Sequence, residues 1–240
     1  MPGGAVRAVA VFGICLGLPG PADAAPPLLD AAGQLHPAWQ LIGLPQARKP
    51  LTRFTAERLD GHAGVRIVAD HSYGNWVHTL APPAALRTLR WSWRVDQPNP
   101  QTQLASKAGD DVAARVCVSF ELPLDRLSFL ERQKLLLART VSQLDLSAAT
   151  LCYVWGGHEA RGALIDNVYT RRVRQIVLRN ADDALRTWYD EQRDVAADFL
   201  RAFHDEAHEL PPATVLMIGG DTDNSGAHTL AHVADLQASP

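Results

Sequence analysis

Short segments of alternating apolar and polar residues, separated by turn residues, constrain the fold of this chain more than any other feature. In Thr88–Val95 (TLRWSWRV) every second side chain is apolar, from Leu89 to Val95, and the side chains between them are polar. This alternation is typical of an antiparallel strand that buries one face. Segments with strand character recur along the chain, at residues 51–59, 65–70, 75–81, 113–120, 150–155, 173–178, 214–218 and 229–236.

Two longer segments have helical patterns instead. Residues 128–146 begin with Ser128 and Glu131 at the spacing of a capping box. One helical face of this segment carries four apolar residues, Leu130, Leu137, Val141 and Leu144. The second segment, residues 190–208, has an apolar stripe and ends before Pro211 and Pro212, which cannot continue a helix.

These strands and helices predict a mainly β protein. Short antiparallel strands of this kind are typical of two packed sheets, so we expect a two-sheet antiparallel β-sandwich, jelly-roll-like, with two inserted helices. The sequence has no internal repeat with a period of about 20–50 residues, which argues against a propeller or a solenoid.

The first residues have the order of a signal peptide. Arg7 precedes an apolar run at residues 8–18, and Ala22, Asp23 and Ala24 have the small-x-small pattern of a cleavage site. We expect cleavage after Ala24 and export to the periplasm or out of the cell, with no membrane span left in the mature protein. We expect residues 25–50, rich in Pro, Ala and Gly, to form a lead-in segment and residues 51–238 to form a single domain.

Charge and motifs exclude several classes of function. The formal net charge of −3 argues against a nucleic-acid partner, which would require a basic face. The sequence contains no G-x-S-x-G, no phosphate-binding glycine loop, no G-x-G-x-x-G and no H-E-x-x-H. The common nucleophile, nucleotide and zinc-protease signatures are therefore absent.

Export would leave the mature chain with Cys117 and Cys152. Both lie inside apolar strand-like segments, VCVSF and LCYVW. If the two strands are neighbours, the cysteines can form a disulfide in an oxidising compartment. Otherwise they are two small buried hydrophobic residues, and the sequence leaves both interpretations open.

The stretch MIGGDTDNSGAH, residues 217–228, is the first candidate site. Its oxygen-bearing residues alternate ahead of Gly226, as in the first half of a calcium loop. Position 12 of such a loop is His232 rather than a glutamate, and the flanking segments are strands. The same residue types also favour an ordinary β-turn. The alternatives are therefore a turn and a cation site, with calcium as the candidate ion. The candidate ligands of that site are Asp221, Asp223, Asn224 and Ser225.

A second cluster, KAGDDVAAR, contains Lys107, Asp110, Asp111 and Arg115. Alternation along a strand sends the adjacent carboxylates to opposite faces, so one can form a salt bridge while the other faces a cleft. The alternative is a solvated turn with one salt bridge.

Histidine pairs offer further, weaker metal sites. His204 and His208 are one helical turn apart, close enough to share zinc, but their surroundings are those of a solvated helix end. His228 and His232 share one face of the last strand, and with Asp221 and Asp223 they would suit zinc or manganese. Packed or solvated histidines are the alternative in both cases.

Aromatic residues allow two interpretations. Sugar rings stack on exposed Trp and Tyr side chains, but most of the aromatic residues here lie on the apolar side of their strands. We therefore expect a core position for Trp91, Trp93, Tyr153 and Trp155. Trp76 and Trp188 lie nearer the ends of elements and are the better candidates for exposure.

Several segments together resemble a bacterial family known as domain of unknown function 3047. They are LRWSWRVD, KAGDDVAARVCVSF, LCYVWG, WYDEQRDVAADFLRAF, and MIGGDTDNSG followed by VADL, in this order. The resemblance covers residues 51–236, and the helical stretch 128–146 is expected to be shorter in relatives. It implies an exported or envelope-associated protein similar to carbohydrate-binding β-sandwich domains, and it implies no activity. It places in recurring motifs Lys107, Asp110, Asp111, Arg115, Trp155, Arg193, Asp198, Asp221, Asp223 and Asn224.

Three hypotheses for function follow. The first is a non-catalytic binding module for a glycan or an envelope component, with candidate ligand-binding residues Lys107, Asp110, Asp111, Arg115, Trp155 and Arg193. The second is a hydrolase of a glycan or ester, metal-assisted or based on two carboxylates at a fixed separation. The third is a structural or assembly protein of the envelope, in which the acidic residues form salt bridges and turns. The sequence favours the first.

Overall fold

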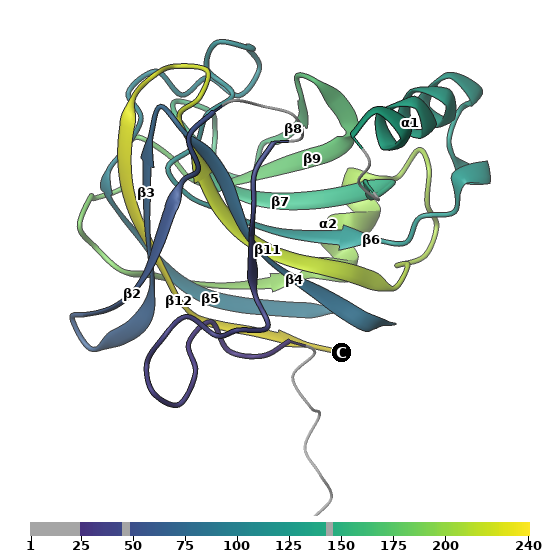
Figure 1. Ribbon diagram of the computed structural model, residues 1–240. Helices are drawn as coiled ribbons and strands as arrows, with labels where there is room; N and C mark the ends of the chain where they lie inside the picture. The colour runs from purple at the N-terminus through teal and green to yellow at the C-terminus, as the bar shows by residue number, and fades with distance from the viewer. Residues whose placement is uncertain (1–24, 45–48, 143–145) are drawn as a thin grey trace, which may run out of the picture.

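Two β-sheets pack face to face to form the body of the protein (Figure 1). This computed structural model describes residues 25–44, 49–142 and 146–240, so the predicted signal peptide lies outside the described residues. The mainly β, two-sheet architecture with two helices is confirmed. Among the described residues, no helix is both long enough and apolar enough to cross a bilayer.

The larger sheet has seven strands, in the order β1-β4-β11-β6-β7-β9-β8. In that order the strands are Gln40–Ile42, Tyr73–Ala84, Ala213–Asp221, Arg115–Phe120, Ala149–Trp155, Thr170–Arg179 and Leu164–Asn167. Neighbours are antiparallel except β7 and β9, which run parallel. The expected all-antiparallel arrangement is therefore wrong at this one pair, because β7 reaches β9 through a long connection and not through a hairpin.

The smaller sheet has five strands, in the order β10-β5-β12-β3-β2. In that order the strands are Tyr189–Asp194, Thr88–Gln97, His228–Ser239, His62–Asp70 and Arg53–Leu59. All four pairs of neighbours are antiparallel. The last strand, β12, therefore lies between two strands from the first half of the chain.

All nine predicted strands are present, and three further strands were not predicted: β1, β8 and β10. The predicted helix over residues 190–208 is wrong at its start, because residues 190–194 belong to β10, which pairs with β5. The helix α2 covers only Val195–Ala202. The Asp194 side chain caps it by accepting a hydrogen bond from the Ala197 N–H at 2.9 Å.

The main core lies between the sheets and is rich in aromatic residues. Trp91, Trp93, Tyr153 and Trp155 are each at most 2% exposed, as expected. Their rings contact one another in tilted or edge-on pairs with centroids 5.3–5.7 Å apart. The lead-in segment contributes Leu28 and Trp39 to the same core.

A smaller apolar cluster covers the outer face of the seven-stranded sheet, on the side away from the main core. It contains Leu104, Val112, Cys117, Cys152, Val154 and Val177. Cys117 and Cys152 lie opposite each other on β6 and β7 and form a disulfide, with a Cα–Cα separation of 4.1 Å. The disulfide interpretation of the two cysteines is the one that the structure shows. Leu104 and Val112 come from the segment before β6, so this cluster holds that segment against the sheet.

The helix α1, Phe129–Ser142, lies at the rim of the molecule (Figure 1). Ser128 Oγ accepts a hydrogen bond from the Glu131 N–H at 3.3 Å, as expected for the predicted cap. Of the apolar residues predicted on one face, Leu130 and Leu137 are 69% and 65% exposed. That face points to solvent, while Leu135 packs against the body at 4% exposure. Leu144 lies outside the described residues.

Candidate functional site

Polar groups from four parts of the chain converge on the outer face of the seven-stranded sheet. Asp221 ends β11, the turn of residues 222–227 follows it, and Asp110 and Asp111 precede β6. The turn between β8 and β9 brings Tyr169 to the same place, where its hydroxyl lies 3.1 Å from Asn224 Oδ1. The register β6–β11–β4 sets these segments side by side, so the strand order builds the site.

Three carboxylates form an acidic cluster, Asp111, Asp221 and Asp223, whose oxygens all lie within 4.8 Å of one another. Among the described residues this is the only group of three or more acidic, His or Cys side chains close enough to hold a metal ion. Two sequence motifs that are about 110 residues apart therefore meet at one point.

Asp111 is fully buried and anchors the turn of residues 222–227. Its carboxylate accepts hydrogen bonds from the Asn224 and Ser225 backbone N–H groups, at 3.2 and 2.6 Å. It also accepts from Ser225 Oγ at 2.6 Å and from Asn224 Nδ2 at 3.0 Å. Gly226 closes the turn at φ +68°, and its N–H donates to the Thr222 carbonyl. One carboxylate thus collects four donors of the DTDNSG stretch.

Asp221 is 3% exposed and forms a buried ion pair with Arg115, whose Nη1 lies 2.7 Å from Asp221 Oδ2. The other oxygen accepts a hydrogen bond from the Val112 N–H at 2.9 Å. Burial raises the pKa of Asp221 to about 6, against the lowering effect of the Arg115 guanidinium. Burial lowers the pKa of Arg115, but the Asp221 carboxylate raises it. At neutral pH both partners are therefore charged.

Arg115 is itself held in place by its other neighbours. Its Nε donates to Asn75 Oδ1 at 3.0 Å, and its guanidinium carbon lies 5.1 Å from the centroid of the Tyr73 ring. Burial raises the pKa of Tyr73, so this tyrosine stays neutral. A cation and two neutral polar side chains therefore back the acidic cluster from the sheet.

A metal ion at the acidic cluster would use carboxylate oxygens that already accept hydrogen bonds from the protein. Asp111 accepts from four donors and Asp221 from two. Ser225 Oγ donates to Asp111 and lies 3.1 Å from Asn99 Nδ2. Asp223 is only partly buried, and its pKa is raised by burial and by Asp111. The contacts fit a carboxylate-anchored turn better than they fit a calcium shell of six to eight oxygens.

Next to the acidic cluster lies a second group of polar side chains, which we call the Tyr169 face: Lys107, Asp110, Asn167, Tyr169 and Gln175. Asp110 is 9% exposed and accepts hydrogen bonds from Asn167 Nδ2 at 2.6 Å and Gln175 Nε2 at 3.4 Å. Burial raises the pKa of Asp110 against the lowering effect of these two amides. Tyr169 is 57% exposed, with Lys107 Nζ 5.5 Å from its ring centroid.

The structure places Trp155 and Arg193 away from this site. Trp155 is 2% exposed in the main core, on the inner face of the sheet. Arg193 forms a bidentate pair with Asp198, at 2.8 and 2.7 Å, and lies 5.8 Å from the Tyr153 ring centroid. Tyr153 Oη also donates to Asp198, at 2.9 Å. This group ties α2 to the core and offers no contact surface at the acidic cluster.

The histidines are not joined to the aspartates as the mixed metal site requires. His232 is buried, and its Nε2 lies 2.7 Å from Glu57 on the smaller sheet, while His228 lies beside Gln97. His204 Nδ1 lies 3.2 Å from the Arg201 carbonyl at an exposed turn. Trp188 is partly buried and stacks on His62, with centroids 4.3 Å apart.

The sequence did not single out several residues of the site. They are Tyr73, Asn75, Asn99, Asn167, Tyr169 and Gln175. None of them lies in a motif with a chemical spacing, and they meet only through strand pairing and the loops that join the strands. The one local signal is the short D-N-V-Y stretch at residues 166–169, whose Asn favours a turn.

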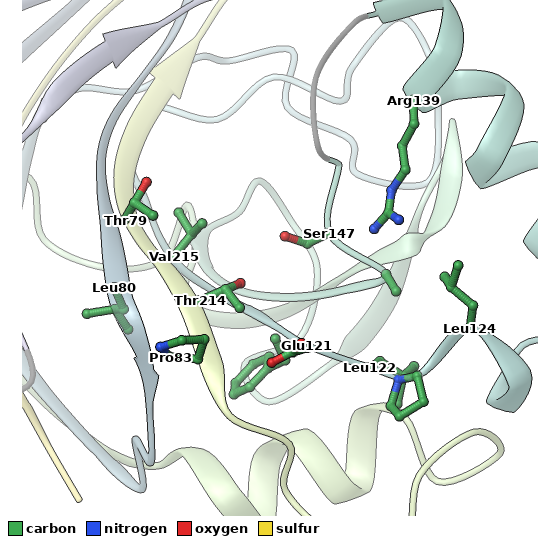
Figure 2. A pocket seen from close by; sticks show the side chains of 13 residues that line it. Thr79, Leu80, Pro83, Glu121, Leu122, Leu124, Arg139, Ser147, Thr214 and Val215 are labelled. Atoms are coloured by element: carbon green, nitrogen blue, oxygen red, sulfur yellow. The ribbon is translucent and has the colours of Figure 1, made fainter.

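A depression of about 630 Å³ lies at the other end of the seven-stranded sheet, where β6 ends and β11 begins. Figure 2 shows Thr79 and Val215 on one side of it and Arg139 of α1 on the other. Its lining is mixed, with Leu122, Pro123 and Leu124 beside Ser147 and Thr214. It contains none of the acidic residues of the candidate site, so cavity volume and carboxylate chemistry point to different ends of the sheet.

Comparison with known proteins gives a family and several likenesses among solved structures. Among solved structures, the chain is similar to "Endoglucanase cel12A from Rhodothermus marinus", with a TM-score of 0.41 and 14% sequence identity. This match covers 86% of this chain and 97% of the endoglucanase. No curated protein matches the chain. The family described as "Protein of unknown function (DUF3047)" matches residues 37–237, as expected from the sequence motifs, and the chain belongs to this family.

Proposed function

We propose that this protein is a non-catalytic binding module for a glycan or another polyhydroxylated component of the cell envelope, bound at the Tyr169 face. The observation that carries this proposal is an exposed tyrosine ring close to a nearly buried carboxylate–amide pair. Tyr169 is 57% exposed, and Asp110 lies 2.6 Å from Asn167 Nδ2. Sugar rings have apolar C–H faces that stack on aromatic rings, and hydroxyls that bond to carboxylates and amides.

The polar groups of this face are held in fixed positions before a ligand arrives. Asn167 and Gln175, from β8 and β9, fix both oxygens of Asp110. The disulfide and its apolar cluster hold the preceding segment through Val112, and Asp111 fixes the adjoining turn. A site fixed in this way loses less conformational entropy on binding, which favours affinity for a weakly apolar ligand.

The proposal includes export of the chain to the periplasm or the cell exterior. The signal-peptide pattern of residues 1–24 supports it, and so does the Cys117–Cys152 disulfide, because such bonds persist in oxidising compartments.

A carboxylate-based hydrolase is the second candidate. The observation in its favour is that burial raises the pKa values of Asp110 and Asp221, as expected of a general acid. Against it, Asp221 is paired with Arg115, and Asp111 is bonded to the turn. Two carboxylates committed to protein donors are poorly placed to act on a glycosidic bond. We therefore place binding ahead of hydrolysis.

Binding of the exported chain to soluble peptidoglycan fragments and to an array of bacterial polysaccharides tests the proposal. Tyr169→Ala should weaken binding about tenfold, because a stacked ring contributes roughly 1.5 kcal/mol. Leu185→Ala is the matched control, since it truncates an exposed apolar side chain near β10 on the other sheet. The control should bind as the parent does.

Three outcomes contradict the binding module. One is that the parent binds none of these glycans, and another is that Tyr169→Ala binds them with unchanged affinity. The third is release of reducing ends by the parent that Asp110→Asn abolishes, which would establish the hydrolase instead.

A further inference from the structure

The helix α1 presents an apolar face to solvent. Phe129, Leu130 and Leu137 are 66%, 69% and 65% exposed, and Leu136 is 39% exposed. Helical spacing places these four residues on one side, around Gln133. Such a contiguous group of large exposed side chains is unusual for the surface of a soluble monomer and marks an interaction surface.

Contacts on the opposite side fix the direction of this face. Leu135 is 4% exposed against the body of the protein. The Glu131 carboxylate lies 3.5 Å from Arg172 Nε of β9, and Arg139 Nε donates to the Leu146 carbonyl at 2.8 Å. The helix is therefore docked through its other side, and the apolar face is held outward at the rim of the molecule (Figure 1).

Cationic side chains flank the apolar face. The Arg132 guanidinium carbon lies 6.0 Å from the Phe129 ring centroid. On the opposite flank the Lys134 side chain is 74% exposed, and its Nζ lies 3.0 Å from the Glu131 carboxylate. The segment from Leu124 to Ser142 has four basic and two acidic residues, a net charge of +2, within a chain whose formal net charge is −3. The segment that carries the apolar face is thus net positive in a net negative chain.

We propose that α1 docks this protein on the surface of an anionic phospholipid bilayer. Its 14 residues span about 21 Å, too short to cross the hydrocarbon core, so the helix lies in the plane of the interface. Phe129, Leu130 and Leu137 enter the boundary between headgroups and acyl chains. Arg132 and Lys134 remain at the depth of the lipid phosphates.

The same charges argue against a second copy of this chain as the occupant. Pairing two α1 faces would bring Arg132 and Lys134 of one copy near those of the other, and facing like charges oppose association. Protein interfaces are also depleted in Lys. An anionic lipid surface is complementary to both the apolar face and its cationic flanks.

Flotation of the exported chain with vesicles of phosphatidylcholine, alone or mixed with phosphatidylglycerol, tests this proposal. The parent should float with the anionic vesicles, bind phosphatidylcholine weakly, and detach in high salt. Leu130→Ser/Leu137→Ser should lose at least tenfold in binding. Leu51→Ser/Leu185→Ser, which alters exposed leucines on other elements, should bind as the parent does. Arg132→Gln/Lys134→Gln should lose about 25-fold, from roughly fivefold for each charge near an anionic surface.

Each alternative result overturns the proposal. Absence of the parent from the anionic vesicle fraction does so, and so does unchanged binding of Leu130→Ser/Leu137→Ser. Light scattering that shows a dimer of the parent, lost in Leu130→Ser/Leu137→Ser, would assign the face to a second copy. Glycan binding at the Tyr169 face is measured without vesicles, so either proposal can fail alone.

Discussion

At the scale of single residues, Asp111 gathers the polar groups that a cation would gather in one of the two interpretations of the DTDNSG stretch. The DTDNSG stretch needs something to gather its polar groups, and the buried Asp111 carboxylate accepts from four of its donors. The sequence showed both acidic motifs but not their pairing, because only the β6–β11 register brings residue 111 to the turn. Turn propensity and these contacts both favour the turn, and the calcium experiment below tests it.

Removing this carboxylate should destabilise the protein strongly. Asp111→Ala leaves four donors without their acceptor in a buried site, which we expect to cost about 2–4 kcal/mol in the free energy of unfolding. Urea denaturation measures this cost. Asp223→Ala, in the same cluster but only partly buried, is the matched control and should cost less than about 1 kcal/mol. Equal costs for the two variants would mean that Asp111 does not anchor the turn.

Calcium should leave the stability of the protein unchanged. The oxygens of Asp111 and Asp221 already accept hydrogen bonds, so an ion has to displace those donors to bind. Melting temperatures in EDTA and in excess calcium should therefore agree. A site filled at 100 times its dissociation constant would add about 2.7 kcal/mol of stability, which a melt detects readily. A rise with calcium that Asp221→Ala removes would establish the cation site instead.

At the scale of elements, the alternation of apolar and polar residues located most of the strands. Segments without this alternation form strands only because they pair with a neighbouring strand. The segment DEQRD at residues 190–194 has no apolar alternation, yet it forms β10 because it pairs with the edge of β5. There Glu191 accepts a hydrogen bond from Trp93 Nε1 at 3.1 Å. The apolar face of α1 was visible in the sequence, but its exposure was not, since periodicity does not say which side packs.

Ion pairs between β9 and the turn after α2 should make stability depend on pH in the acid range. Arg174 is buried, and its Nη1 lies 2.8 Å from Asp205 Oδ1. Burial raises the pKa of Asp205, but Arg174 and Arg171 lower it by more, to about 2 from 3.8. The folded state therefore binds fewer protons than the unfolded state between these values. The stabilisation that the Asp205 ion pairs provide is present above pH 3.8 and is lost as the pH falls towards 2.

Asp205→Asn isolates this contribution. The lowering of the Asp205 pKa from 3.8 to about 2 corresponds to about 2.5 kcal/mol of stability. We reduce this to about 1 kcal/mol because Asp205 is partly exposed to solvent. The parent should have the higher free energy of unfolding. The difference between parent and variant should be about 1 kcal/mol larger at neutral pH than near pH 2. Urea denaturation at both pH values measures the two differences. An equal difference at the two pH values would show that the ion pair does not contribute.

At the scale of the whole molecule, the sequence predicted the fold class, the family and part of the candidate site. Asp110, Asp111, Arg115, Asp221 and Asp223 were identified because they stand in local motifs, and the structure brings them together. Asn167, Tyr169 and Gln175 were not identified, because they join the site only through the pairing of β8, β9 and β7. Trp155 was a candidate by motif, but its place on the strand assigns it to the core.

The Cys117–Cys152 disulfide should stabilise the whole domain and, through it, the site. It closes a loop with a sequence separation of 35 residues, which restricts the unfolded chain by up to about 4 kcal/mol in the chain-entropy description. Cys117→Ala/Cys152→Ala should therefore lower the free energy of unfolding by about 2–4 kcal/mol in urea. A reducing agent should produce a similar loss in the parent and no further loss in the variant.

Loss of the disulfide should also weaken the candidate site. Val112 packs in the apolar cluster around the disulfide, and its N–H binds Asp221, so loosening this cluster releases the segment that carries Asp110 and Asp111. We expect limited proteolysis of Cys117→Ala/Cys152→Ala to cut first in residues 98–112, and glycan affinity to fall with it. Proteolysis that begins elsewhere, with unchanged affinity, would show that the disulfide stabilises the fold without supporting the site.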